Sequence, residues 1–415
     1  MRISVNGSAN NDVLIVGGGI GGLTLALMLH EQGIPCRVLE AAPEIKPLGV
    51  GINLLPHAMK ELTALGLQSA LAAVAVETRE LAFYNRHGQF IFKEPRGRFA
   101  GYEWPQLSIH RGDLHVALIE EARKRLGADR VLLDRKCTQV DQDANGVTVH
   151  TADAGVHRGA AAVGCDGFHS AVRRQFYPDE APPHYGGINM WRGVTWAKPY
   201  LTGASMVLAG ALRTGQMVIY PIRPGLDAKG RQLINWVAEI EQPDHGANDW
   251  SKKGRLADFF PAFKDWCFDW LDAAALLETA ETVLEYPMVD RDPVTRWSFG
   301  RVTLLGDAAH PMYPRGSNGA GQAILDARTL ATLLKSRADP AAALKAYESE
   351  RLPATSKVVL TNRTRPPDAI LDEVDKRTGG ERFARIEDVI SQDEMAAMSE
   401  GYKQVAGFGK SQLRP

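Results

Sequence analysis

The stretch from Asp12 to Glu40, DVLIVGGGIGGLTLALMLHEQGIPCRVLE, constrains the fold more than any other part of the sequence. An apolar run, Val13 to Val16, leads into a glycine cluster. A segment with helical apolar spacing, Leu23 to Leu29, comes next, and a second short run, Arg37 to Leu39, ends at Glu40. This order of strand, helix and strand predicts a βαβ unit, in which a helix joins two parallel strands.

The glycines of this unit have the spacing G-x-G-x-x-G, at Gly17, Gly19 and Gly22. Gly17 permits a tight turn, Gly19 lets the backbone approach a pyrophosphate, and Gly22 lets the helix pack on the strand. The free amides and positive dipole end of the helix can then hold phosphates. Glu40 suits the two hydroxyls of an adenosine ribose and repels a 2′-phosphate, which favours FAD or NAD over NADP at this site.

Composition sets limits on size, partners and compartment. A chain of 415 residues is expected to form two or three packed units. Its 48 basic and 49 acidic residues nearly cancel, so neither a nucleic acid nor an anionic membrane is expected as a partner. The four cysteines are scattered without metal-site or CxxC spacing, and no apolar run reaches the length of a membrane span. We therefore expect a cytoplasmic protein with reduced thiols.

Two further segments end apolar strands in glycine and aspartate: Gly164-Cys165-Asp166-Gly167 and Gly306-Asp307. In open α/β sheets, ligands bind beyond the carboxyl ends of the strands, so these segments can face one site together with the first glycine cluster. A single ligand that touched all three would be long. Between the last two segments, four β-like stretches from Tyr185 to Glu241 predict an antiparallel sheet, whereas residues 249–280 have a helical, aromatic pattern.

Together these motifs resemble the single-component FAD-dependent aromatic hydroxylases of the para-hydroxybenzoate hydroxylase type, the group A flavoprotein monooxygenases. Three segments carry the resemblance: GGGIGG with Glu40, GCDGFHSAVR from Gly164 to Arg173, and GDAAHPMYPRGSNGAGQAILDA from Gly306 to Ala327. Within the family, the chain is most similar to the branch of the methylphenazine-carboxylate hydroxylases. That branch implies a substrate that is a fused or carboxylated aromatic small molecule.

The resemblance implies an α/β (α+β) fold with three parts. A discontinuous Rossmann-like FAD-binding domain would comprise residues 12–78, 101–180 and 286–365. Residues 79–100 and 181–285 would form an inserted antiparallel β-sheet substrate domain. Residues 366–415 would form a C-terminal helical extension.

The resemblance also implies a role for individual residues around FAD. Glu40 would bind the ribose, Arg111 would reach the phosphate and ribityl region, and Asp307 would bind ribityl hydroxyls. Asp166, braced by Arg173, would help to position the nicotinamide donor. The cofactor-binding set is Gly17, Gly19, Gly22, Glu40, Arg111, Asp166, Arg173, Gly306, Asp307, Gly316, Asn318, Gly319 and Ala320. Taken singly, the aspartates also fit helix caps or turns, and the arginines fit solvated surface positions.

The candidate substrate contacts lie on the β segments or on the turn expected around the flavin ring. They are Trp191, Arg192, Met217, Tyr220, Trp236, Pro311 and Tyr313. The aromatic members equally fit a protein core. Arg315 could attract a carboxylate or face solvent, and His310 has no companion at metal-ligand spacing, so no metal is expected.

The resemblance implies a monooxygenase in which NADH or NADPH reduces FAD and oxygen reacts to give a flavin C4a-hydroperoxide. The distal oxygen of that hydroperoxide is transferred to the aromatic ring, and no side chain is assigned as acid, base or nucleophile. The alternatives are a reductase, oxidase or halogenase on the same fold, an NAD-dependent dehydrogenase, and a non-catalytic flavin-binding protein. The halogenase motif WxWxIP is absent from the sequence. Whether the protein is a monomer or a homodimer stays open.

Overall fold

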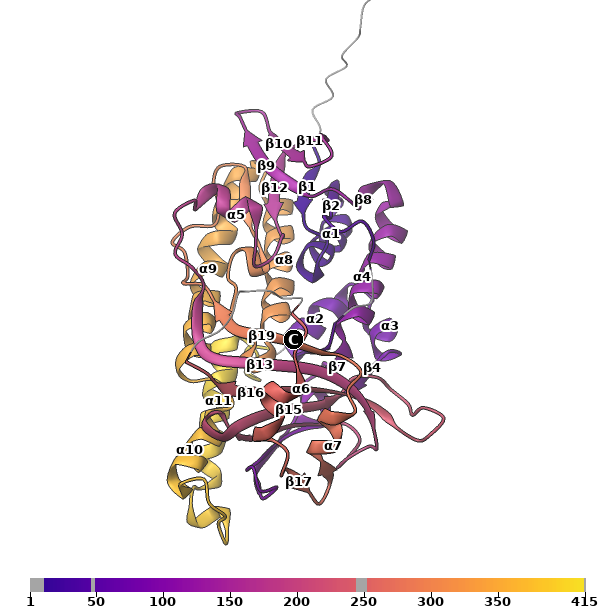
Figure 1. Cartoon of the computed structure of the whole chain (residues 1–415). Coiled ribbons are helices and arrows are strands. Elements are labelled where there is room, and N and C mark those ends of the chain that lie inside the picture. The colour runs from indigo at the N-terminus through magenta and orange to yellow at the C-terminus, as the bar shows by residue number, and fades with distance from the viewer. Residues whose placement is uncertain (1–10, 46–48, 244–251, 414–415) are drawn as a thin grey trace, which may run out of the picture.

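The computed structural model describes residues 11–45, 49–243 and 252–413. In the described chain, a five-stranded sheet with helices on it occupies one end of the molecule, and a seven-stranded sheet crosses the other end (Figure 1). The C-terminal helices run beside the seven-stranded sheet, shown in yellow. This arrangement agrees with the predicted α/β fold, which has a second sheet and a helical extension.

The predicted βαβ unit is present as β1 (Val13–Val16), α1 (Ile20–Glu31) and β2 (Cys36–Leu39). The parallel sheet has the order β20–β12–β1–β2–β8, with β20 at Val302–Leu304, β12 at Ala161–Gly164 and β8 at Val131–Leu132. Val16 pairs with Gly164, and Gly164 pairs with Leu304. The three strands that carry the motifs are therefore adjacent and end at the same edge.

Helices cover this sheet and two small antiparallel sheets extend it. Gly66 adopts a left-handed conformation with φ of 76° and separates the first two of these helices. The helices are α2 (Pro56–Ala64), α3 (Gln68–Ala72), α4 (Arg111–Leu126), α5 (Ala171–Phe176), α8 (Gly319–Ser336) and α9 (Pro340–Thr364). The small sheets are β3 (Gly51–Leu54), β7 (Leu107–His110) and β4 (Ala75–Glu77), and β11 (Val156–Gly159), β10 (Val147–Thr151) and β9 (Cys137–Gln142).

The seven-stranded sheet contains all four predicted β segments and a hairpin formed by β5 and β6. Its order is β19 (Val283–Asp290), β13 (His184–Ala197), β16 (Gln232–Glu241), β15 (Gly215–Pro221), β14 (Ser205–Ala211), β5 (Glu80–Tyr84) and β6 (Phe90–Pro95). The pairing is antiparallel except between β14 and β5, which are parallel. Because β19 continues to Asp290, the domain boundary expected at residue 286 falls inside a strand of this sheet.

One face of the seven-stranded sheet packs against an aromatic cluster, which we call the outer face. Trp191, Trp236 and Phe259 are fully buried there, and the Phe259 ring stacks on Trp191 at 5.2 Å. The prediction of helix over residues 249–280 is largely wrong. The part before residue 252 lies outside the described residues, and the rest forms only short elements, because its aromatic side chains cap a sheet. These elements are α6 (Leu256–Phe259), β17 (Cys267–Phe268), β18 (Leu271–Asp272) and α7 (Ala273–Glu278).

The C-terminal helices α10 (Ala369–Thr378) and α11 (Gln392–Ala406) cover part of the opposite, inner face of the same sheet. Ile370 and Met395 belong to one buried cluster with Leu81, Phe83 and Leu208 of the sheet. Tyr313, in the loop before α8, packs on another part of this face against Met190 and Val237. Two parts of the chain therefore share the inner face.

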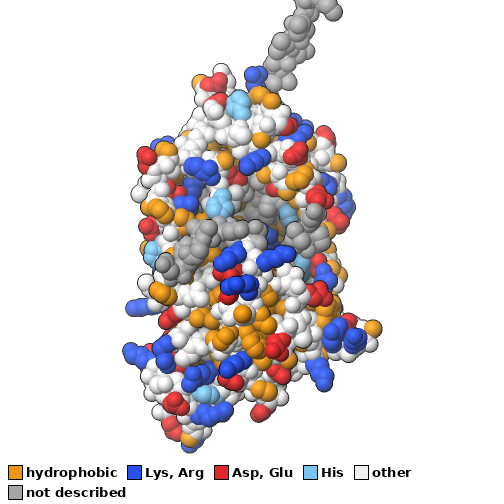
Figure 2. All heavy atoms as spheres, viewed as in Figure 1, with side chains coloured by type: hydrophobic (Ala, Val, Ile, Leu, Met, Phe, Trp, Pro, Cys, Tyr) orange, Lys and Arg blue, Asp and Glu red, His pale blue; other side chains and the backbone are white. Residues whose placement is uncertain are grey.

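Two further features concern the charge on the visible surface and the character of the helices. Figure 2 shows basic and acidic side chains interspersed over the visible face, in keeping with the balanced charge of the sequence. Within the described residues, no helix combines the length and apolar character that a bilayer crossing needs.

The outer aromatic cluster generates a stability prediction. Phe259→Ala should lower the free energy of unfolding by about 3–5 kcal/mol, because it leaves a cavity between two buried tryptophans. Phe90→Ala is the matched control: this ring is 42% exposed, so the loss should be about 1 kcal/mol or less. Urea unfolding followed by tryptophan fluorescence measures both, and equal losses would contradict the packing described here.

Candidate active site

A cavity of about 380 Å³ lies between the carboxyl edge of the parallel sheet and the inner face of the seven-stranded sheet. Backbone from all three predicted motifs lines it, at Gly19, Gly167 and Gly306. Gly319 and Ala320, at the start of α8, complete this side. The opposite wall comes from β13, β15 and β16. The expectation that the three motifs meet around one ligand is therefore consistent with the geometry.

The three glycines of the first motif have different surroundings. Gly17 has φ of 110°, and a Cβ atom there would lie 2.3 Å from the Cys165 carbonyl oxygen. A Cβ atom on Gly22 would lie 2.0 Å from the Gly17 carbonyl oxygen, whereas Gly19 has nothing within 4 Å. Gly17 and Gly22 thus permit close packing of turn, strand and helix. Gly19 leaves open space at the start of α1, where a ligand's phosphates could approach.

Glu40 is fixed beside this glycine cluster at the end of β2. Its carboxylate accepts hydrogen bonds from the backbone amides of Gly18, at 2.6 Å, and Ala42, at 2.7 Å. The Gly18 carbonyl in turn lies 2.6 Å from the His115 imidazole of α4. These contacts hold the carboxylate next to the phosphate-binding turn, where the sequence predicts ribose binding.

The Asp166 carboxylate points into the first turn of α5. It accepts hydrogen bonds from the Ser170 hydroxyl, at 2.5 Å, and from the backbone amides of Ala171 and Val172. Burial raises the pKa of Asp166, and these hydrogen bonds oppose that rise. The neighbours Cys165 and Gly167 line the cavity. The structure thus shows a helix-capping contact for Asp166 and leaves the predicted contact with a nicotinamide donor as a prediction.

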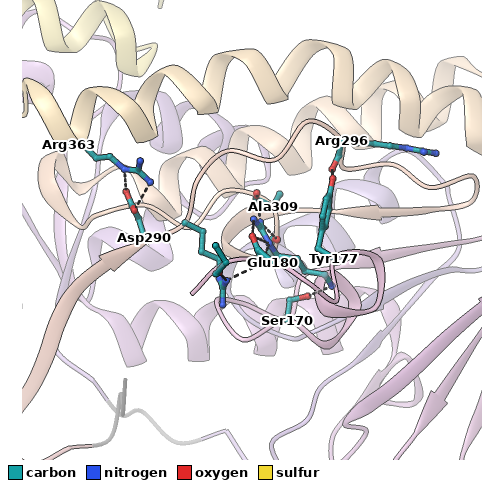
Figure 3. A network of polar contacts seen from close by, with 11 residues as sticks. Ser170, Tyr177, Glu180, Asp290, Arg296, Ala309 and Arg363 are labelled. Atoms are coloured by element: carbon teal, nitrogen blue, oxygen red, sulfur yellow. Dashed lines mark hydrogen bonds and ion pairs between the residues drawn. The ribbon is translucent and has the colours of Figure 1, made fainter. Parts of the chain in front are cut away.

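Arg173 joins the second motif to the third, and Figure 3 shows two of its partners, Glu180 and Ala309, close together. Its guanidinium donates hydrogen bonds to the carbonyl oxygens of Ala308, at 2.9 Å, and Ala309, at 2.8 Å, and forms an ion pair with Glu180. The side chain is buried, so the alternative of a solvated helix residue does not hold. Its contacts go to the loop after Gly306 and not to the Asp166 carboxylate, so the expected bracing of Asp166 is indirect.

Asp307 and Arg111 face the cavity from two sides. Asp307 is open to the cavity but enclosed by protein, and this desolvation raises the pKa of its carboxyl group; His310 and Arg111 oppose the rise. No side-chain hydrogen bond or ion pair joins Arg111 to another described residue, and its side chain is exposed to the cavity. Both groups are free to contact a ligand.

A buried ionic cluster holds the Gly306–Asp307 loop. His310 Nε2 lies 2.5 Å from Asp326 Oδ2, and Arg351 donates a hydrogen bond to Asp326 Oδ1 at 2.7 Å. Asp326 also accepts a hydrogen bond from the Gly306 amide at 3.2 Å. Burial would raise the pKa of Asp326, but His310 and Arg351 lower it below its ordinary value. His310 therefore supports the loop from within this buried cluster and does not line the cavity.

The turn that precedes α8 is held by the C-terminal extension. Gly316 has φ of 75°, and a Cβ atom there would lie 2.0 Å from the Tyr402 hydroxyl. That hydroxyl accepts a hydrogen bond from Asn318 Nδ2 at 2.9 Å and lies 2.8 Å from Asn362 Oδ1. The role of Tyr402 was missed from the sequence, because no local pattern links a tyrosine in α11 to a turn so far away along the chain.

The predicted substrate contacts divide according to the two faces of the sheet. Arg192, Tyr220 and Tyr313 line the cavity. Trp191, Met217 and Trp236 lie in the aromatic cluster of the outer face, and the buried Pro311 does not line the cavity. The placement of these four around the substrate needs correction. Successive side chains of a strand point to opposite faces, so Trp191 and Arg192 lie on opposite faces of the sheet.

The same alternation reveals a cavity residue that the sequence analysis missed. Glu239 of β16 is buried and shares the inner face with Val237, and Gln216 Nε2 donates a hydrogen bond to its carboxyl group at 3.2 Å. Burial and the nearby Asp368 carboxylate raise the pKa of Glu239 to about 7. The sequence LINWVAEI contains the relevant pattern. In a strand, Glu239 lies on the face opposite to Trp236 and Ala238.

The raised pKa of Glu239 generates a prediction of pH-dependent stability. Between its ordinary value of 4.5 and about 7, the folded protein keeps a proton that the unfolded chain loses. Unfolding is therefore favoured as pH rises through this window. Relative to Glu239→Gln, the wild-type protein should lose stability on the order of 3 kcal/mol between pH 4.5 and 7 and then level off. Urea unfolding at pH 5 and pH 8 measures it, and a constant difference would refute the assignment.

Comparisons with known proteins bear on the identity of the ligand. The FAD binding domain family matches residues 10–258 and 263–362. The chain is 45% identical over 368 residues to phenazine 1,6-dicarboxylic acid hydroxylase of Lysobacter antibioticus, covering 86% of this chain and 90% of the relative. It is 33% identical to 3-hydroxybenzoate 6-hydroxylase of Polaromonas naphthalenivorans, covering 86% of this chain and 87% of that relative.

A solved structure shares the fold. A variant of HpxO from Klebsiella pneumoniae, in complex with FAD, superposes with a TM-score of 0.78 at 24% identity, covering 97% of this chain and 100% of that chain. That likeness shows the fold, whereas the family model and the two relatives show the family. The chain belongs to the FAD binding domain family, and within it to the FAD-dependent aromatic hydroxylases.

Proposed function

We propose that this enzyme uses NADH or NADPH and dioxygen to hydroxylate an aromatic carboxylate with fused rings. The observation that carries the proposal is a pair of arginines, Arg111 and Arg192, that face one cavity from opposite walls. The Arg111 guanidinium has no hydrogen-bond or ion-pair partner among the described residues. One Arg192 nitrogen donates to the Gly51 carbonyl, but its buried Nε has no hydrogen-bond partner among them. A guanidinium group with unused N–H donors can bind a carboxylate through charge-assisted hydrogen bonds. The likeness to a phenazine dicarboxylic acid hydroxylase supports the fused-ring class.

The residues present fit FAD along the edge of the parallel sheet. We assign the ribose to Glu40, the pyrophosphate to the open space at Gly19, and the ribityl chain to Asp307 and Arg111. The start of α8 at Gly319 would lie against the flavin ring, where its amides favour negative charge. When bound, FAD supplies the redox chemistry that activates oxygen.

The protein's own contribution is to orient the ring and to exclude water. The inner face of the seven-stranded sheet closes the cavity with Met190, Val218 and Val237, which present apolar surface to a bound ring. Tyr220 lies beside Arg192, and burial raises the pKa of its hydroxyl, so it remains a neutral hydrogen-bonding group. No side chain is needed as a nucleophile.

We further propose that the enzyme works in the cytoplasm. All four cysteines lie in the described part of the chain, and none of them is in a disulfide. Burial raises the pKa of the Cys36 and Cys137 thiols to about 12, so these two are unreactive. Free thiols of this kind are typical of a reducing compartment.

The activity is tested with the purified, FAD-loaded enzyme. Phenazine-1,6-dicarboxylate and 3-hydroxybenzoate are supplied with NADH or NADPH under ¹⁸O₂. The expected result is ligand-stimulated oxidation of the nicotinamide and one ¹⁸O atom in the product. Oxidation of the nicotinamide with peroxide as the only oxygen product would instead indicate a reductase or oxidase.

A glycine variant tests where FAD binds. Gly19→Val should reduce FAD retention at least tenfold while the chain still folds, because the new side chain enters space that only a ligand would fill. Gly401→Val is the matched control, since Gly401 also has open surroundings but lies in α11, away from the cavity. The flavin-to-protein absorbance ratio after gel filtration measures both, and equal retention would refute the placement.

A further inference from the structure

Glu239 lies in the wall between two cavities. The first is the cavity of the candidate active site, and the second has a volume of about 70 Å³. They share the residues Val218, Glu239, Pro314 and Ser317. The second cavity is roofed by the C-terminal helices and contains enough space for water. A carboxyl group in this wall can therefore contact a ligand on one side and exchange protons with water on the other.

The charged groups around Glu239 leave it without an ion-pair partner among the described residues. Arg315 is paired with Asp368, at the start of α10. The second cavity also contains Arg96 and Lys403, and both are paired with Glu94. Arg192 reaches the cavity from β13, and one of its nitrogens donates to the Gly51 carbonyl at 3.0 Å.

Glu239 and Asp368 share one donor. Gln216 Nε2 donates to Glu239 Oε2 at 3.2 Å and to Asp368 Oδ2 at 2.9 Å. Gln216 Oε1 and Asp368 Oδ1 are buried and have no hydrogen-bond partner among the described residues. Two buried carboxylates with one shared amide favour a proton on one of them, and Asp368 already has Arg315 to balance its charge. When the pair holds one proton, that proton is therefore on Glu239 and not on Asp368.

An aromatic carboxylate bound to Arg192 would bring a third negative charge to this inner face. The cost of placing it beside an ionised Glu239 is high in a buried site. Protonation of Glu239 removes the repulsion and turns its carboxyl group from an acceptor into a donor.

We propose that Glu239 takes up one proton when an aromatic carboxylate binds, and that it then donates a hydrogen bond to an acceptor on that ligand. This inference rests on the proposed function and narrows its substrate class. The proton comes from solvent, an O–H bond forms on the Glu239 carboxyl group, and no electrons are transferred. The favoured ligand carries a carboxylate for Arg192 and a second acceptor, such as a ring nitrogen, for Glu239.

The test measures binding to the FAD-loaded enzyme without turnover. Phenazine-1,6-dicarboxylate and 3-hydroxybenzoate are titrated between pH 5.5 and 9, with the flavin absorbance change as the readout of Kd. For the wild-type enzyme, Kd should rise towards tenfold per pH unit above about pH 7, where free Glu239 is ionised. Calorimetry at pH 8 in phosphate and in Tris buffer should show uptake of about one proton per ligand.

Two variants isolate the role of Glu239. Glu239→Gln should make Kd independent of pH above 7 apart from the ligand's own ionisation, and should abolish proton uptake. Glu285→Gln is the matched control: Glu285 is a buried carboxylate of the same sheet, on β19, but it is paired with Lys252 and does not line either cavity. Its profile should match that of the wild type.

The outcomes separate this inference from the proposed function. Binding without proton uptake in the wild-type enzyme, or the same pH profile in Glu239→Gln, overturns the inference even if hydroxylated product forms. Proton-coupled binding without incorporation of ¹⁸O upholds the inference and overturns the proposed function. Failure of both probes to bind at any pH overturns the inference, because the cavity would then not accept aromatic carboxylates.

Discussion

The parallel pairing of β20, β12 and β1 is the constraint on which the site depends. Because Val16, Gly164 and Leu304 are in register, the three chain segments that follow these strands emerge side by side. Arg173 then locks two of them together through the carbonyl oxygens after Asp307. A long cofactor can contact all three because hydrogen bonding between strands fixes their relative positions, and the loops themselves need little rigidity.

The second constraint is the alternation of side chains in the seven-stranded sheet. The same strands supply a dry aromatic cluster on the outer face and a mixed polar and apolar wall on the inner face. The outer cluster fixes the backbone of β13, β15 and β16, and the backbone fixes Arg192, Tyr220 and Glu239. Trp191 and Trp236 therefore support the cavity wall from the opposite face of the sheet. This division explains how a polar group such as Glu239 is held in a buried position.

The C-terminal extension is part of the site's architecture. Tyr402 fills the space left by Gly316 and contacts Asn318, so α11 determines the shape of the turn that opens α8. Asp368 of the same extension pairs with Arg315 and adds to the negative environment of Glu239. The extension thus shapes both the turn that opens α8 and the part of the cavity wall that contains Glu239.

The sequence by itself determined the local units and the cofactor class. The glycine spacing, the strand-ending aspartates and Glu40 are local patterns of a few residues, so the βαβ unit and the resemblance to the FAD family could be recognised in the sequence. Only the tertiary structure decided which side of the sheet faces the ligand, and therefore that Trp191, Met217 and Trp236 lie outside the cavity and Glu239 lies in it. Which face of a sheet borders a cavity depends on the elements that pack against each face. These elements come from distant parts of the chain. The contacts of Arg173 and Tyr402 were decided in the same way, because each joins elements whose proximity exists only after folding.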